Sequence, residues 1–293
     1  MHVLLTGGTG FIGEALVPAL RDEHHEVSVL SRSREEEGDG LRYVTALDAL
    51  PAPVDAVINL AGASLAEKRW TAAYKTTIRE SRLGTTRALG DYFAKRDETP
   101  AVWLNGSAIG FYGPQGDNAL DESAANGSGF AAALCRDWEQ AARDAAPEGT
   151  RLCLLRLGVV LDAGGGAYPQ MAAPFRMGVG NWVASGQQFL SWIHRRDTVA
   201  AILYLLNHDS ASGAFNLTAP NPVTSREFCA AMKRQYRTLV TLPMPAPVMR
   251  LMVGEMADEL LITGQRVIPQ ALEGSGFSFS APDIDTALAE IAA

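Results

Sequence analysis

A glycine-rich turn directly after a short apolar strand is the feature that most restricts how this chain can fold. Residues 2–6 read His-Val-Leu-Leu-Thr and run straight into Gly7, Gly8, Gly10 and Gly13. These glycines fit two overlapping patterns, Gly8-x-Gly10-x-x-Gly13 and Gly7-x-x-Gly10-x-x-Gly13. Because glycine has no Cβ, such a turn can bend sharply, approach a pyrophosphate closely and pack the next helix onto the strand.

A helix is expected over 11–21, immediately after the turn. The amides at its N-terminus and the positive end of its dipole would then face a bound phosphate. A tight turn with only a structural role is the alternative interpretation. The position of the motif, between an opening strand and a helix, favours dinucleotide binding.

Composition and charge limit the possible partners. With 293 residues, of which 47% are hydrophobic, the chain can form one large α/β domain, or a core domain with a smaller lobe. A net charge of −8 and the lack of a long basic run argue against nucleic acid. No apolar stretch approaches the roughly 18 residues of a membrane span. We therefore expect a small-molecule substrate and no membrane partner.

The cysteines indicate the compartment. Cys135, Cys153 and Cys229 are odd in number and lack the spacing of metal ligands, so we expect free thiols and no metal site. The apolar strand already begins at the second residue, which leaves no room for a cleaved signal peptide. The expected location is the cytoplasm.

Strand-like and helix-like segments alternate in the first half of the chain. After the opening strand, strands are expected over 26–30, 41–45, 54–60, 101–105 and 151–161. Helices are expected over 71–95, which contains no proline, and over 128–146. Strands separated by helices predict a parallel sheet covered on both faces. The expected fold class is α/β, a doubly wound parallel sheet of the Rossmann type.

After Leu161 the pattern changes, which predicts a second, smaller lobe. A helix is expected over 168–177, an irregular loop over 178–188, returning strands over 189–194 and 214–217, and a helix over 197–207. Thr224-x-x-Glu227 is a capping box that predicts the start of another helix. We assign residues 1–160 with 188–218 to a cofactor-binding domain, and 161–187 with 219–293 to a C-terminal substrate-binding lobe.

The end of the second expected strand indicates the cofactor. NAD-binding folds usually place an acidic residue about 20 residues past the glycines, where it binds the ribose hydroxyls. Here the sequence is Ser31-Arg32-Ser33-Arg34, with no acid in that place. Arg32 can instead pair with a 2′-phosphate, and Ser31 or Ser33 can donate a hydroxyl hydrogen. An exposed arginine in a polar turn is the alternative, but the pattern favours NADP(H).

Several motifs together resemble one family. Thr6 to Gly13, Asn59 to Gly62 and Ser107 to Gly113 are similar to the extended short-chain dehydrogenase/reductase superfamily. A narrower resemblance, to atypical epimerase-family proteins often labelled nucleoside-diphosphate-sugar epimerases, covers nearly the whole chain. Its motifs are Arg69-Trp70, Lys75 with Ser81-Arg82, 135–139 (Cys-Arg-Asp-Trp-Glu), 156–161 (Arg-Leu-Gly-Val-Val-Leu), 191–194 (Ser-Trp-Ile-His), 254–257 (Gly-Glu-Met-Ala) and 265–269 (Gln-Arg-Val-Ile-Pro).

The resemblance implies a Rossmann sheet that binds NADP(H), with a C-terminal lobe closing over the nicotinamide. Gly7, Gly10 and Gly13 would hold the pyrophosphate, Ala61 and Gly62 would border the adenosine, and Ser107 would lie near the nicotinamide. The predicted cofactor-binding set is Thr6, Gly7, Gly10, Phe11, Ile12, Gly13, Ser31, Arg32, Leu60, Ala61, Gly62, Lys75 and Arg156.

The usual proton relay of this superfamily, Tyr-x-x-x-Lys, is missing. None of the seven tyrosines is followed four residues later by lysine. If Glu139 anchors the helix, Ala131 and Cys135 fall where the tyrosine and the lysine are expected. Neither can move the proton, because alanine has none to give and a helical thiol is more often a packed apolar group.

Other residues are therefore candidates for catalysis: Ser107, Tyr112 and His194. Each has a structural alternative. Ser107 can satisfy backbone groups at the strand end, Tyr112 can pack against its neighbours, and His194, whose ordinary pKa suits acid–base chemistry, can be a buried structural residue.

Two predicted cofactor contacts also have structural alternatives. Lys75 shares a helix face with Arg79 and Arg82, and this basic stripe can be solvated or dimer-facing. Arg156 can anchor Asp197 or Glu139.

Two functions remain open. One is an NADP(H)-dependent oxidoreductase or epimerase acting on a small organic or nucleotide-linked substrate. The other is a non-catalytic NADP(H)-sensing regulatory protein, which would keep the phosphate turn and lose the relay. A homodimer through the helices over 71–95 and 128–146 is also possible.

Overall fold

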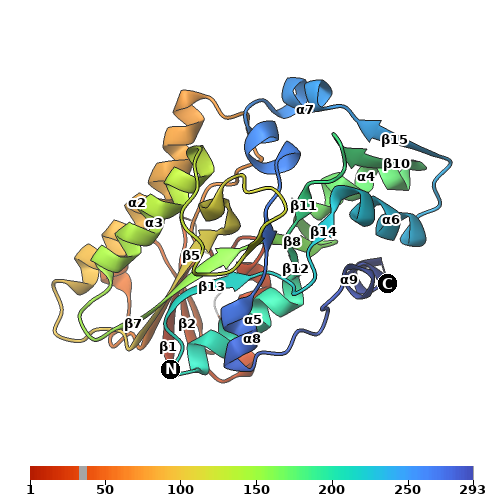
Figure 1. Ribbon diagram of the computed structural model, residues 1–293. Coiled ribbons are helices and arrows are strands. Elements are labelled where there is room, and N and C mark those ends of the chain that lie inside the picture. The colour runs from red at the N-terminus through yellow and green to blue at the C-terminus, as the bar shows by residue number, and fades with distance from the viewer. Residues whose placement is uncertain (33–37, 293) are drawn as a thin grey trace.

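A seven-stranded parallel sheet forms the centre of the protein (Figure 1). The computed structural model describes residues 1–32 and 38–292. The strand order is β3-β2-β1-β4-β5-β7-β13. The strands are β1 His2–Thr6, β2 Glu26–Leu30, β3 Leu41–Val44, β4 Ala56–Asn59, β5 Val102–Ala108, β7 Arg151–Leu157 and β13 Gly213–Leu217. The chain starts at β1 and builds outward on both sides of it, which confirms the predicted doubly wound fold.

Helices cover both faces of the sheet, so its strands are apolar on both sides. Val3 and Leu5 of β1 pack with α1 (Gly13–Asp22) and α5 (Arg195–Asn207). Leu4, between them in sequence, points to the opposite face and packs with α2 (Ala72–Phe93). Helix α3 (Phe130–Ala145) lies beside α2 on that face.

The strand registers place the C-terminal ends of β1, β2 and β4 side by side. Thr6, the last residue of β1, pairs with Leu30 of β2 and with Asn59 of β4. Segments that follow these three strands therefore meet at one edge of the sheet. The order of connections reverses beside β1, and such a switch point is where ligands bind in open α/β sheets.

The C-terminal lobe has a separate apolar core. Tyr168, Phe175, Trp192, Phe228 and Leu288 are among its buried side chains. Its elements are α4 Tyr168–Arg176, β10 Val179–Val183, β11 Phe189–Leu190, β14 Val223–Thr224, α6 Ser225–Gln235, β15 Val240–Met244, α7 Ala246–Val253, a π-helix Ala257–Ile262 and α9 Ile284–Ala292. The other short elements are β6 Ala119–Leu120, β8 Val159–Asp162, β9 Gly165–Gly166, β12 Trp192–His194, β16 Arg266–Val267, α8 Gln270–Ser275 and the 3₁₀ turns Leu47–Ala49 and Ile109–Tyr112.

The structure corrects the sequence prediction in three places. The single strand expected over 151–161 divides at Gly158, because Val159 leaves the sheet and donates to the carbonyl of Ser191. The strand over 189–194 likewise divides, at Ser191. The loop expected over 178–188 contains β10, which pairs with β15, some 60 residues later along the chain. Local sequence pattern does not report pairings over such distances.

Helix α8 packs on the opposite side of the predicted domain boundary. Residues 219–293 were assigned to the lobe, yet Leu272 of α8 belongs to the core under the central sheet. The capping box is confirmed. Thr224 Oγ1 accepts from the Glu227 amide at 3.2 Å, and the Glu227 carboxylate accepts from the Thr224 amide at 2.7 Å.

Candidate functional site

The glycine turn after β1 is held by close backbone approaches. Gly7 has φ +75°, and a Cβ there would lie 2.7 Å from the carbonyl oxygen of Leu60. A Cβ on Gly13 would lie 2.2 Å from the Gly7 carbonyl oxygen. Both positions therefore require glycine for the fold itself. Gly8 packs against Val29, where a Cβ would meet Cγ1 at 2.7 Å.

Gly10 differs from Gly7, Gly8 and Gly13 of the same turn because it is exposed. A Cβ there would approach only the Gly7 carbonyl oxygen, at 3.2 Å. The fold thus leaves space over Gly10 that a side chain would fill. The turn ends where α1 begins, and the Glu14 amide already donates to the Gly10 carbonyl at 2.8 Å, so the amides available to a ligand are the earlier ones, at 11–13. This combination can hold an anionic diphosphate.

The ends of β2 and β4 flank the turn. After β4, Leu60 and Ala61 are half-buried and Gly62 is exposed. The guanidinium of Arg82 packs under Gly62, with Cζ 2.9 Å from where a Cβ would be, and donates to the Ala63 carbonyl at 3.0 Å. After β2, Arg32 is exposed. Ser33 lies outside the described residues.

Behind this edge lies a buried polar ladder. Thr6 donates to Asn59 Oδ1 at 2.6 Å, and its hydroxyl accepts from the Ala61 amide at 3.2 Å. Asn59 donates in turn to Asn105 at 2.8 Å and to Thr86 at 2.9 Å. The ladder joins β1, β4, β5 and α2 and fixes the loop after β4. Thr6 was predicted to bind the cofactor, and the structure uses its hydroxyl inside this ladder.

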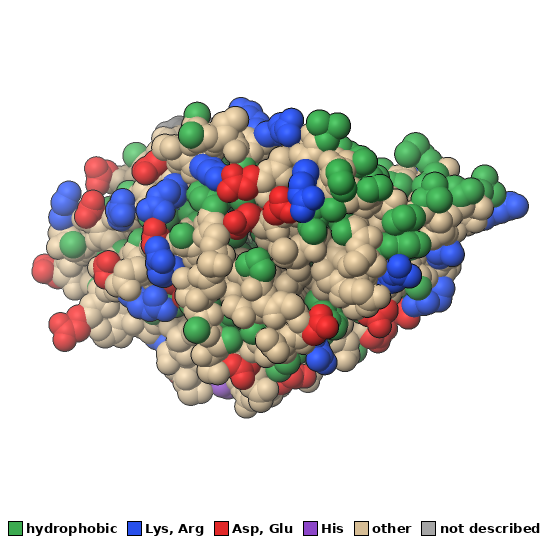
Figure 2. Space-filling model, turned by 45° about the horizontal axis from the view of Figure 1, so that its top comes forward, with side chains coloured by type: hydrophobic (Ala, Val, Ile, Leu, Met, Phe, Trp, Pro, Cys, Tyr) green, Lys and Arg blue, Asp and Glu red, His purple; other side chains and the backbone are tan. Residues whose placement is uncertain are grey.

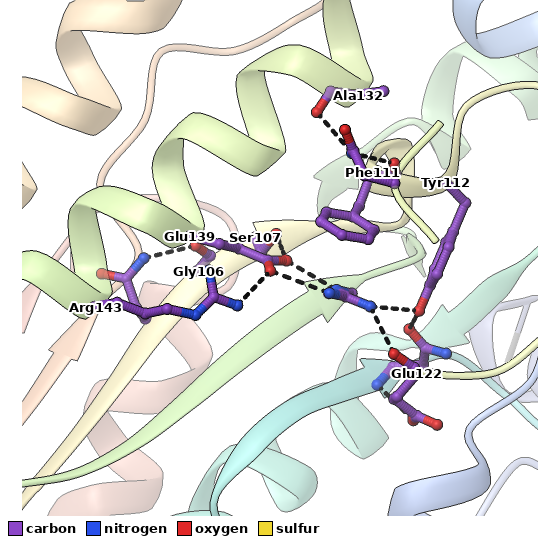
Figure 3. A network of polar contacts seen from close by, with 12 residues as sticks. Gly106, Ser107, Phe111, Tyr112, Glu122, Ala132, Glu139 and Arg143 are labelled. Carbon is purple, nitrogen blue, oxygen red and sulfur yellow. Dashed lines mark hydrogen bonds and ion pairs between the residues drawn. The ribbon is translucent and has the colours of Figure 1, made fainter. Parts of the chain in front are cut away.

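A second buried network surrounds Glu139 (Figure 3). Glu139 is fully buried and accepts from Arg156 twice, at 2.8 Å on Oε1 and 3.1 Å on Oε2. Ser107 donates to the same Oε1 at 2.8 Å, and Arg143 reaches Oε2 at 3.2 Å from the helix surface. The alternative in which Arg156 anchors Glu139 is confirmed. Asp197 instead accepts from the amides of Ser280 and Ala281.

The network continues from Arg156 to Tyr112. Arg156 donates to the Tyr112 hydroxyl at 2.9 Å, and that hydroxyl donates to Asn216 Oδ1 at 2.6 Å. The guanidinium also lies 3.6 Å from the centre of the Phe111 ring. Burial raises the pKa of Tyr112, although Arg156 and Asn216 oppose the rise. Burial lowers the pKa of Arg156, and the hydrogen bonds and charge of Glu139 more than reverse this.

Ser107 and Tyr112 thus lie in one network, with their hydroxyl hydrogens already accepted by protein groups. Tyr112 is fully buried and its pKa is raised, so this geometry does not support direct proton transfer to a substrate. Sequence analysis missed Asn216 and Glu122. Glu122 accepts from the Asn216 amide at 2.9 Å and from the Ala271 amide at 3.1 Å. A polar residue in the apolar strand 213–217 was the readable signal for Asn216.

Two small buried side chains, Ala131 and Cys135, occupy the positions where the tyrosine and the lysine of the relay are expected. Ala131 and Cys135 lie on α3 against Gly110, whose Cβ would be 3.2 Å from Ala131 Cβ and 3.7 Å from Cys135 Sγ. Burial, reinforced by the charge of Glu139, raises the pKa of Cys135 to about 11. The thiol therefore stays protonated near neutral pH and does not act as a base.

Lys75 does not point into the sheet edge. Its ammonium binds both oxygens of Glu255, at 2.7 and 2.6 Å, and lies 4.9 Å from the centre of the Phe130 ring. Nearby, the Glu259 carboxylate accepts from the amides of Phe130 and Ala131 at the start of α3. Segment 255–259 of the lobe is thus fixed to the helices of the sheet domain. The predicted cofactor contact of Lys75 stays a prediction.

His194 caps α5. Its Nδ1 accepts from the Arg196 amide at 3.1 Å, and burial lowers its pKa despite the opposing charge of Glu290. This arrangement matches the structural alternative for His194, and its catalytic role stays a prediction.

Because folding lowers the pKa of His194, the unfolded chain binds a proton at higher pH than the folded protein. The stability that this group contributes is therefore full above the unfolded pKa of about 6.5 and is lost as pH falls through the lower folded value. We expect His194→Asn, which keeps an N-cap acceptor, to reduce the fall in melting temperature below pH 6.5. Part of the fall should remain, because burial also lowers the pKa of His25. Thermal melts across pH, with exposed His24→Asn as the matched control, measure it. An unchanged slope in H194N would contradict the assignment.

Comparisons with known proteins agree with this fold. The model of the NAD-dependent epimerase/dehydratase family matches residues 3–218, and a domain of unknown function (DUF1731) matches 244–291. An epimerase family protein of Mycobacterium bovis, Mb2239, is 39% identical over 98% of this chain and 96% of its own. One from Staphylococcus aureus, SAB0724c, is 36% identical, covering 98% of both chains.

A similar solved structure is the human epimerase family protein SDR39U1, crystallised with NADPH. It superposes with a TM-score of 0.89 at 35% identity, over 100% of this chain and 99% of the other. A nucleoside-diphosphate sugar epimerase from Corynebacterium glutamicum has a TM-score of 0.79 at 30% identity, over 100% of this chain and 58% of the other.

Proposed function

The chain belongs to the NAD-dependent epimerase/dehydratase family, and we propose that it binds NADP(H) and exchanges hydride with a small organic or nucleotide-linked substrate. The observation that carries the proposal is the turn at Gly7, Gly10 and Gly13, which is closed by backbone contacts everywhere except over Gly10. A pyrophosphate placed there would face the N-terminus of α1. The dinucleotide halves would then extend along the ends of β2 and β4 on one side and β5 and β7 on the other.

The choice of NADP(H) over NAD(H) rests on Arg32. Its side chain is exposed directly after β2, where a ribose 2′-phosphate would arrive. The NADPH in the human relative supports the same choice.

The cofactor supplies a hydride when bound, and the residues of this chain orient it. Reduction of a carbonyl by NADPH consumes one proton and yields an alcohol and NADP⁺. With Ala131 and Cys135 in the relay positions and Tyr112 buried, we propose that this proton comes from water or from an acidic group of the substrate. The networks around Asn59 and Glu139 hold the edge of the sheet rigid beneath the reacting atoms.

Turnover tests the proposal. Purified protein with NADPH and a panel of carbonyl and nucleotide-sugar substrates should oxidise NADPH and form one alcohol per NADPH consumed. Tight NADPH binding with neither NADPH oxidation nor epimerisation of any substrate in the panel would instead favour the non-catalytic sensor, for which the apolar relay positions are the specific observation. A sensor must bind a partner differently with NADPH and NADP⁺, because a ligand without differential affinity shifts no equilibrium.

Arg32→Ser is expected to weaken NADPH binding by about ten- to a hundredfold while leaving NADH binding nearly unchanged, because only NADPH carries the 2′-phosphate. Arg42→Ser removes the same charge from exposed Arg42 in the middle of the neighbouring strand β3, and it should leave both affinities unchanged. Fluorescence titrations with both cofactors measure the change. Equal losses for NADPH and NADH in R32S would remove Arg32 from the phosphate site.

The predicted homodimer through α2 and α3 stays a prediction. These helices border a surface groove of about 650 Å³, lined by Leu83, Arg87, Asp91 and Asp144 among others. Analytical ultracentrifugation decides between monomer and dimer.

A further inference from the structure

Exposed apolar side chains gather at one end of the C-terminal lobe. Among the described residues, eight large apolar side chains are strongly exposed, and seven of them lie at position 177 and within 239–252. We call these seven the apolar tip: Met177, Leu239, Val240, Leu242, Val248, Leu251 and Met252. In Figure 2 green side chains cover the tapering end of the molecule, with blue ones beside them. Contiguous exposed patches of this kind mark interaction sites.

The residues of the apolar tip come from three segments that adjoin one another in the fold. Strand β15 pairs with β10, and the Leu239 amide donates to the Gly178 carbonyl at 2.7 Å, which places Leu239 beside Met177. Helix α7 follows β15 directly, and none of its residues is buried. Its exposed residues Val248, Leu251 and Met252 have the i, i+3, i+4 spacing of one helix face.

Unpaired cations border the tip. Arg176 precedes Met177, Arg237 lies two residues before Leu239, and Lys233 of α6 packs with its Cδ 3.5 Å from the Cβ position of Gly180 in β10. All three are exposed, and within residues 1–32 and 38–292 none forms an ion pair. The chain as a whole carries −8, so this basic border is opposite in sign to the rest of the molecule.

Two other occupants fit less well. An added peptide strand would pair with the open edge of β15. Val240 and Met244 face β10, so by alternation Thr241 and Pro243 face the open edge, where Pro243 has no N–H to donate. A second copy of this chain, docked by two-fold symmetry, would bring the same cations face to face.

We propose that the apolar tip is a peripheral docking surface for an anionic lipid bilayer. Its apolar side chains would enter the boundary between headgroups and acyl chains, and Arg176, Lys233 and Arg237 would contact the anionic headgroups. In the described part of the chain, no helix is long and apolar enough to cross a membrane. The sequence-based expectation of no membrane partner rested on the lack of a span, and surface docking requires none. The acidic remainder does not prevent docking, because at physiological salt the Debye length is only about 8 Å.

Vesicle sedimentation of the full chain tests the proposal. Binding is expected to phosphatidylcholine vesicles that contain about 30% phosphatidylglycerol, with little binding to phosphatidylcholine alone and less at high salt. Leu239→Ser/Leu242→Ser should lower partitioning at least about tenfold, because both side chains lose apolar burial in the lipid. Arg176→Ser/Arg237→Ser should lower it by about tenfold or more, at roughly fivefold per cation.

Arg87→Ser/Lys95→Ser, on α2 and just after its end, is the matched charge control and should bind as the wild type does. Because all substituted side chains are exposed, melting temperature and NADPH affinity should be unchanged in every variant. Absence of wild-type binding, equal binding to neutral vesicles, or unaltered binding of the tip variants would overturn the proposal. So would self-association that the leucine variants abolish in the absence of vesicles.

Discussion

Replacing Gly10 by valine is expected to lower NADPH affinity by at least about a hundredfold while the protein stays folded. The new Cβ would approach only the Gly7 carbonyl oxygen, at 3.2 Å, so the turn needs to adjust by a few tenths of an ångström. The side chain would instead fill the space where the pyrophosphate must approach the backbone. Calorimetric titration with NADPH, alongside a thermal melt, measures both effects.

Gly13→Ala should behave in the opposite way, with the loss mainly in stability. Its Cβ would lie 2.2 Å from the Gly7 carbonyl oxygen and 2.5 Å from Gly8 Cα, so backbone must move. A cost of more than about 3 kcal/mol in the free energy of unfolding follows. Gly84→Ala is the control, because its Cβ would meet only Glu80, at 3.6 Å, within α2. It should stabilise the protein by up to about 1 kcal/mol. If G10V binds NADPH normally, the proposed function fails at its central observation.

Glu139→Gln is expected to destabilise the protein by about 3–5 kcal/mol, because it leaves the Arg156 guanidinium buried without a counter-charge. For a chain of this size, roughly 2–4 °C per kcal/mol predicts a fall in melting temperature near 10 °C. Chemical denaturation and thermal melts measure the loss.

A double variant separates the effect of the buried charges from that of the surrounding hydrogen bonds. Glu139→Leu/Arg156→Met removes both charges and should be more stable than E139Q, since replacing a whole buried pair by apolar groups is often neutral. Arg143→Ala should cost less than about 1 kcal/mol, because the Arg143 side chain is 46% exposed. A double variant no more stable than E139Q would show that the hydrogen bonds to Ser107 and Tyr112, rather than the buried charge, dominate.

Elements set by local pattern were predicted well. The 22-residue helix α2 begins after Thr71, which caps it, and its interior contains no proline to stop it. The parallel sheet followed from buried apolar runs separated by helices, because strands covered on both faces cannot show polar alternation. The start of α6 was also predicted correctly, because the interactions of its capping box all lie within four residues of the chain.

Elements that depend on distant partners were not predictable. Strand β10 reads as a glycine-containing loop until β15 supplies its hydrogen bonds. The catalytic candidates show the same limit. Sequence spacing placed Ser107 and Tyr112 near the end of β5, but only Glu139, Arg156 and Asn216, from three other elements, reveal that both hydroxyls are already engaged.

The sequence by itself determined the fold class, the position of the glycine turn and the missing Tyr-x-x-x-Lys pair. The turn and the missing pair depend on residues close together in the chain, and the fold class depends on the alternation of segments that each show a local strand or helix pattern. The tertiary structure decided what each polar side chain binds. It assigned Thr6 to the ladder behind the sheet, Lys75 to Glu255 and His194 to a helix cap. The physical reason is that a polar group pairs wherever the fold supplies a partner, and here those partners are 53 residues away for the buried Thr6 and 180 residues away for the half-buried Lys75.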